Sequence, residues 1–139
     1  MAHFSDRSRT ALLGCDAQLI TVASDVISIF DFAVTCGHRS NDEQAATWAK
    51  GRDEYGNVVD PSEVVTWARP GQSLHNREPS QAFDFAPWPI DWKDVERFAM
   101  IAGAFLYVAK VRGIELEWGG HWKGKKCDRP HIQLRQTRP

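Results

Sequence analysis

Apolar residues recur at helical spacing in two long segments of the chain. The first segment runs from about Ser8 to Phe30, and the second begins at Asp91 or Asp94 and ends near Gly113. A stripe of apolar residues repeating every three or four positions predicts an amphipathic helix packed on a core. In the first segment this stripe consists of Leu12, Leu19, Val22 or Ala23, Val26 and Phe30.

Short apolar or alternating stretches predict four strands, at residues 31–36, 82–86, 114–118 and 131–134. In the second of these, Phe83 and Phe85 point to one side of the strand and Asp84 to the other, because strand side chains alternate. By the same rule His131 shares a face with Gln133 in the last strand.

A third helix is predicted from Asn41 or Asp42, either of which can cap it, to the region of Gly51. Residues 51–62 are polar and rich in turn formers, residues 62–67 fit neither pattern, and residues 69–72 predict a turn. Helices and strands do not alternate regularly. This indicates an α+β fold, with helices packed on a small, mainly antiparallel sheet in a single domain spanning residues 1–139.

Composition and charge exclude several classes of protein. Hydrophobic content is 42%, charged content 25% and formal net charge −1, so no charge excess indicates a nucleic-acid or membrane partner. Three cysteines cannot all pair with one another, which suits a reducing compartment. The first ten residues have no apolar signal core. We therefore expect synthesis in the cytoplasm without a signal peptide, and no stable membrane association.

Candidate chemistry lies in His75, Asp84, Asp128 and His131. Two histidines and one carboxylate form a sufficient ligand set for a catalytic zinc. Asp128, three residues before His131, could handle the proton of an attacking water. Asp84 lies between two phenylalanines, where burial of an unpaired carboxylate is costly. The pattern alone leaves two interpretations of Asp84 open: a metal ligand, or the partner of an arginine in a salt bridge.

Three further features suggest chemistry less specifically. Arg39 follows a predicted strand and could grip a substrate carboxylate or steady an oxyanion. His121 and Cys127 could form a structural zinc site with His131, although their spacings of six and four do not match common zinc-finger patterns. Four tryptophans lie near the proposed site in sequence, and one or two of them could line a substrate groove. They are Trp88, Trp92, Trp118 and Trp122.

Taken in order, several segments resemble the M15 family of zinc peptidases, and most of all the short phage endolysins among them. The matching segments are Gly37-His38-Arg39-Ser40 with Gln44, Gly51-Arg52, residues 65–76, residues 82–87, Trp118-Gly119-Gly120-His121-Trp122 and residues 128–134. The resemblance implies a hedgehog/DD-peptidase-like fold. It implies zinc ligands at His75, Asp84 and His131, and catalytic roles for Asp128 and Arg39. Substrate binding would involve Arg39, Ser40, Gln44 and Trp122.

The resemblance also implies a function. The protein would be a zinc-dependent endolysin that hydrolyses the L-alanyl-D-glutamate bond of peptidoglycan stem peptides, as a monomer, after a separate protein opens the host membrane. The alternatives are a D-Ala-D-Ala carboxypeptidase and a non-catalytic zinc module that binds wall peptide. The chain departs from the family pattern in two places: Asp84 follows His75 by nine positions instead of seven, and His121 replaces a usual aspartate.

Overall fold

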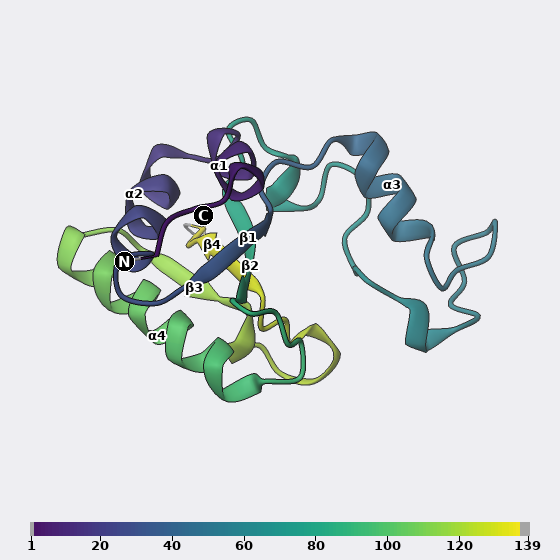
Figure 1. Ribbon diagram of the computed structural model, residues 1–139. Helices are drawn as coiled ribbons and strands as arrows, with labels where there is room; N and C mark the ends of the chain where they lie inside the picture. Colours follow the sequence, from purple (N-terminus) through teal and green to yellow (C-terminus); the bar gives the residue numbers. More distant parts are fainter. Residues whose placement is uncertain (1, 137–139) are drawn as a thin grey trace.

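A four-stranded antiparallel sheet forms the centre of the computed structural model, which describes residues 2–136 (Figure 1). The strand order is β1-β2-β4-β3. The strands are β1 (Phe32–Cys36), β2 (Ala82–Pro87), β3 (Leu116–Trp118) and β4 (His131–Leu134). The four predicted strands and the predicted antiparallel sheet are thus confirmed.

One face of the sheet is covered by the helices α2 (Ala17–Val26) and α4 (Val95–Arg112), which pack on each other, and α4 also packs on β2 and β3. Phe83, Phe85 and Phe105 are fully buried between them, and their rings meet edge to face, with centroids 5.0 to 5.5 Å apart. Asp94 caps the start of α4, and Gly113 ends the helix with a φ of 72°, as the sequence predicts. The α+β fold is confirmed.

The prediction of one helix over residues 8–30 is wrong, because the chain forms two helices there. Helix α1 (Asp6–Leu13) ends at Gly14, and the side chain of Asp16 accepts from the amide of Gln18 to begin α2. Between them the backbone pairs with Ser80, whose amide donates to Gly14 O and whose carbonyl accepts from Asp16 N, both at 2.8 Å. Pairing with Ser80 therefore breaks the helix at residues 14–16, although the apolar residues keep helical spacing on both sides of the break.

Residues 40–72 leave the body as an arm that begins with α3 (Asn41–Ala49) (Figure 1). Ser40, rather than Asn41 or Asp42, caps this helix, because its hydroxyl accepts from Glu43 N while the Glu43 carboxylate accepts from Ser40 N. The returning chain is fixed to α3 by Gln44, which is fully buried and donates to Ala68 O at 2.7 Å. The unassigned segment 62–67 begins in a short 3₁₀ helix, Pro61–Glu63, and continues without regular secondary structure to Thr66, which accepts from Gln44 Nε2 at 3.3 Å.

The second face of the sheet carries polar side chains, since alternation along β2 and β4 turns Asp84, His131 and Gln133 away from the phenylalanine core. This face and the arm together shape the region in which the candidate site lies. No helix in residues 2–136 has the length and apolar character needed to cross a membrane.

Candidate active site

The register of the sheet brings three candidate side chains into one row. Asp84 on β2 lies opposite Cys36 on β1 and opposite His131 on β4. The register shifts by one residue between Val34 and Cys36. Such a bulge turns Cys36 from the core side to the Asp84 side, and bulges are frequent beside active sites for this reason.

His75 reaches the same row from outside the sheet. It lies in a short 3₁₀ turn, Leu74–Asn76, which begins at Ser73 and is held by a bond from His75 N to Ser73 Oγ at 3.1 Å. The ring donates from Nδ1 to Gly37 O at 2.8 Å, because a carbonyl can only accept. Nε2 therefore faces Asp84, 3.3 Å from its Oδ1.

His131 is oriented by a chain of side chains on the polar face of the sheet. Its Nε2 donates to Gln133 Oε1 at 2.8 Å, and Gln133 Nε2 donates to Glu117 Oε2 at 3.0 Å. The indole of Trp122 donates to the other oxygen of Glu117 at 3.4 Å. This arrangement turns Nδ1 of His131 toward Asp84 Oδ1, at 3.4 Å.

Two imidazole nitrogens thus converge on one carboxylate oxygen. Asp84 Oδ1 is buried and accepts no hydrogen bond from any residue between 2 and 136. A buried oxygen without a partner is costly and needs an explanation. A cation shared with the two rings would satisfy it, and residues 2–136 contain two groups of candidate metal-binding side chains, both of which include Asp84. Cys36 and His75 complete one group, and Asp128 and His131 the other.

The electrostatics of this centre also favour a cation. Burial would raise the pKa of Asp84, but His75 and His131 outweigh it and hold the pKa well below its ordinary range. Burial would lower the pKa of His75, yet the Asp84 carboxylate raises it to about 10. The carboxylate therefore draws positive charge into this position, and a metal ion binding there would displace the His75 proton.

Arg39 lies on the other oxygen of Asp84, with NH2 3.8 Å from Oδ2. The sequence left open whether Asp84 binds a metal or an arginine, and the structure places histidines on one oxygen and an arginine on the other. The side-chain oxygen of Gln44 accepts from Arg39 NH1 at 2.8 Å and so helps to hold the guanidinium in place. The hydroxyl of Ser40 caps α3. Direct substrate binding by Ser40 and Gln44 stays a prediction.

Asp128 approaches the centre from the solvent side. Its side chain is 48% exposed, and its Oδ2 lies 4.0 Å from His131 Nδ1. Its backbone is fixed by a bond from Asp128 N to Gly119 O at 2.9 Å. Partial burial, followed by the charge of Asp84, raises the pKa of the Asp128 carboxyl above its ordinary value. Such a shift brings a carboxylate closer to the range useful for proton transfer.

The rival structural zinc site does not form. His121 packs against Trp118, with ring centroids 5.0 Å apart, and Cys127 Sγ contacts Gly120 O at 3.7 Å. Neither residue belongs to a cluster of candidate ligands within residues 2–136. Sequence reasoning instead missed Cys36, whose Sγ is 3.8 Å from His75 Nδ1. Its position became visible only through the bulge in β1.

Comparison with known proteins places the chain in a family. The profile of the family described as phage L-alanyl-D-glutamate peptidase matches residues 1–136. The chain belongs to this family. The predictions of this family and of an L-alanyl-D-glutamate peptidase of the phage type are thereby confirmed.

Individual relatives agree with the family match. The chain is 33% identical to the peptidoglycan L-alanyl-D-glutamate endopeptidase CwlK of Bacillus subtilis over 112 residues, which covers 75% of this chain and 60% of CwlK. It is 30% identical to the L-alanyl-D-glutamate peptidase of Escherichia phage T5, covering 86% and 80% of the two chains. The solved structure of the Serratia marcescens L-Ala D-Glu endopeptidase ChiX matches with a TM-score of 0.71 and 27% identity, covering 96% of this chain and 90% of ChiX.

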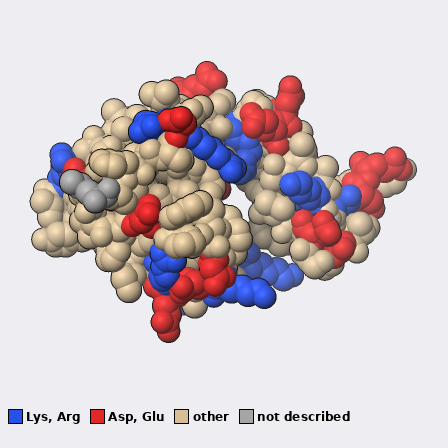
Figure 2. Space-filling view, in the orientation of Figure 1, with Lys and Arg blue, Asp and Glu red and all other residues tan. Residues whose placement is uncertain are grey.

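In this phage peptidase the candidate centre opens into a cavity of about 780 Å³ between the body and the arm. Figure 2 shows the surface hollowed between these two parts. Arg39, His75, Asp84, Asp128 and His131 line the cavity. Trp92 and Trp122, two of the four tryptophans named from the sequence, also line it, and Trp67 adds a third from the arm. That they contact substrate stays a prediction.

Proposed function

We propose that this phage peptidase cleaves the L-alanyl-D-glutamate bond of peptidoglycan stem peptides with a zinc ion held by His75, Asp84 and His131. The observation that carries the proposal is the approach of His75 Nε2 and His131 Nδ1 to the unsatisfied Asp84 Oδ1, at 3.3 and 3.4 Å. Ligands about 2.0–2.1 Å from a tetrahedral zinc lie roughly 3.3–3.4 Å from one another. The two separations fit that spacing.

The orientation of the rings supports the same ligand set. Each histidine donates its other nitrogen to a fixed acceptor, Gly37 O for His75 and Gln133 Oε1 for His131. Metal-binding histidines in proteins are held in this way. Zinc, when bound, supplies Lewis-acid chemistry that polarises the scissile carbonyl and acidifies water.

The other roles fall to groups around this centre. Asp128, exposed to the cavity, takes the proton of the attacking water and passes it to the amine that leaves as the new N-terminus of D-glutamate. Arg39, held by Gln44, binds a carboxylate of the stem peptide or steadies the developing oxyanion. Trp122 forms a wall of the cavity beside His131, with ring centroids 5.1 Å apart.

The proposal includes the biological setting expected from the resemblance. The protein would be made in the cytoplasm of the bacterial host and would reach the wall once a separate protein opens the membrane, causing lysis. All the proposed ligands and catalytic groups lie in one chain, which supports action as a monomer and a single zinc peptidase domain.

Digestion of purified peptidoglycan tests this function. A new amino terminus on D-glutamate, with L-alanine still attached to the glycan, is the expected result. Release of single D-alanine residues would instead identify a carboxypeptidase. No cleavage by folded, zinc-loaded protein would identify a binding module.

The variant Asp128→Asn tests the proposed base. Because the amide keeps the shape but cannot accept a proton, kcat should fall roughly 10²- to 10⁴-fold, while the bound zinc stays at one ion per chain. An Asp128→Asn protein with wild-type activity would remove Asp128 from the mechanism. His131→Ala should lose both zinc and activity.

A further inference from the structure

A second cavity, of about 430 Å³, adjoins the catalytic cavity along β1. Thr35 lines both cavities, and the next residue, Cys36, contacts the His75 ring at 3.8 Å. Because β1 advances about 3.3 Å per residue, the second cavity begins within a few ångströms of the proposed metal ligands. The two cavities therefore share part of their lining at Thr35, beside the proposed metal centre.

The lining of the second cavity combines an exposed aromatic face with unpaired polar groups. Trp88 is 53% exposed, and its backbone amide donates to Asp31 O at 3.1 Å, which fixes it beside β1. Phe4 adds apolar surface, while Arg7 and Asp31 add charges. Within residues 2–136 the side chains of Arg7 and Asp31 form no ion pair with each other or with another residue. Their hydrogen-bonding capacity is available to a ligand.

This combination suits a pyranose ring. A sugar has an apolar face of C–H groups that can lie on an indole, and a rim of hydroxyl and acetamido groups that hydrogen-bond to charged side chains. A mainly apolar cavity with a few placed polar groups is the usual form of a small-ligand site, and its volume lies in the usual range.

If the proposed function is correct, the structure of peptidoglycan indicates which part of the substrate lies near the second cavity. In peptidoglycan the L-alanine of the scissile bond is joined to the lactyl group of muramic acid, and one residue spans at most about 3.6 Å. The sugar therefore lies close to the cleavage site when the stem peptide is bound. The catalytic cavity is also lined by Lys125 and Lys126, which suit the acidic residues of the stem peptide.

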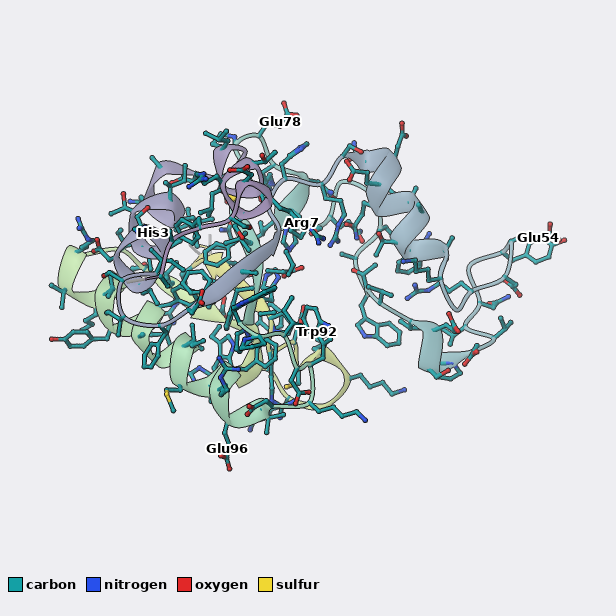
Figure 3. All side chains as sticks on the ribbon, viewed as in Figure 1. His3, Arg7, Glu54, Glu78, Trp92 and Glu96 are labelled. Carbon is teal, nitrogen blue, oxygen red and sulfur yellow. The ribbon has the colours of Figure 1, made fainter. Side chains whose placement is uncertain are left out.

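We propose that the cavity beside β1, with Trp88 and Arg7, is a saccharide subsite that binds the muramyl unit of the glycan strand next to the scissile bond. In Figure 3, Arg7 from the second cavity and Trp92 from the catalytic cavity lie toward the arm, whereas His3, which also lines the second cavity, lies on the far side of the body.

The test compares two substrates: a disaccharide tripeptide, N-acetylglucosaminyl-N-acetylmuramyl-L-alanyl-γ-D-glutamyl-diaminopimelate, and the same tripeptide without sugar. The wild-type zinc enzyme should show a higher kcat/KM on the disaccharide substrate. Trp88→Ala should reduce the ratio of the two kcat/KM values roughly tenfold, the size expected from losing one aromatic contact. Tyr107→Ala, at a residue 71% exposed on α4, is the matched control and should leave the ratio unchanged.

Arg7→Ala gives a second measure that does not depend on the folding of the Trp88 variant, since Arg7 is exposed and lies on α1. It too should lower the ratio. An unchanged ratio in folded Trp88→Ala and Arg7→Ala proteins, or equal wild-type rates on both substrates, would overturn the subsite and leave the proposed function standing. A wild-type enzyme that cleaves neither substrate would overturn the proposed function and the subsite with it.

Discussion

At the scale of single residues, the proposed metal centre depends on how each proposed ligand is held as well as on which residues they are. His75, Asp84 and His131 could be named as candidates from the sequence, because two histidines and a carboxylate form a zinc ligand set, and the resemblance to the M15 family implied the same three residues. Glu117 and Cys36 could not, since their roles depend on strand register and on a bulge that no local pattern encodes.

Gln133 links His131 to Glu117 through two hydrogen bonds. Gln133→Ala frees the imidazole to rotate and should weaken zinc affinity roughly 10- to 100-fold. Competition with a chromophoric chelator measures the affinity. Gln18→Ala, an exposed position on α2, is the matched control. Equal zinc affinity in both variants would show that the side-chain chain does not orient the ligand.

At the scale of elements, the sequence predicted which segments are strands and helices better than where they begin and end. The strands β2 and β4 and the helix α4 lie where their apolar patterns predict them. The ends of α4 are also marked in the sequence, by Asp94 at its start and Gly113 at its end. The break between α1 and α2 was not predicted, since it depends on backbone pairing with Ser80, more than sixty residues away in the chain. Contacts at that separation leave no local signal.

Gly119 and Gly103 differ in the space available for a side chain. A Cβ on Gly119 would lie 2.3 Å from Asp128 O and 3.0 Å from His131 Cβ, so Gly119→Ala must displace the loop that carries Asp128. Stability should fall by about 1–3 kcal/mol and activity by more than tenfold. Gly103 lies in the middle of α4, where an added Cβ would meet nothing within 4 Å. Gly103→Ala should raise stability by about 0.5–1 kcal/mol without changing activity.

Urea denaturation and activity assays on the two variants give both quantities. If Gly119→Ala keeps full activity, the proposed dependence of Asp128 on the close approach of this loop is wrong.

At the scale of the whole molecule, the hydrophobic core and the proposed metal centre lie on opposite faces of one sheet. The core between the sheet, α2 and α4 contains buried apolar side chains and, within residues 2–136, none of the candidate metal ligands. Burial of this core stabilises the predicted α+β fold. The arm, which forms one side of the cavity, is held instead by polar contacts such as those of Gln44. Metal binding is therefore expected to support activity more than folding.

Removal of the metal tests that separation. A chelator should abolish activity, and added zinc should restore it, while the far-ultraviolet circular dichroism of the protein stays native. The Tm should fall by roughly 10 °C, because a ligand that binds only the folded state stabilises it by about 4 kcal/mol at a thousand times its Kd. Unfolding of the chelated protein at room temperature would indicate a structural metal instead.

The most direct test of the central claim is anomalous X-ray diffraction from crystals of the zinc-loaded protein, measured on both sides of the zinc absorption edge. The account predicts one peak within bonding distance of His75 Nε2, Asp84 Oδ1 and His131 Nδ1, with Asp128 beside it but not required to hold it. An active, zinc-loaded protein whose anomalous peak lies elsewhere, or is bound by other side chains, would contradict it.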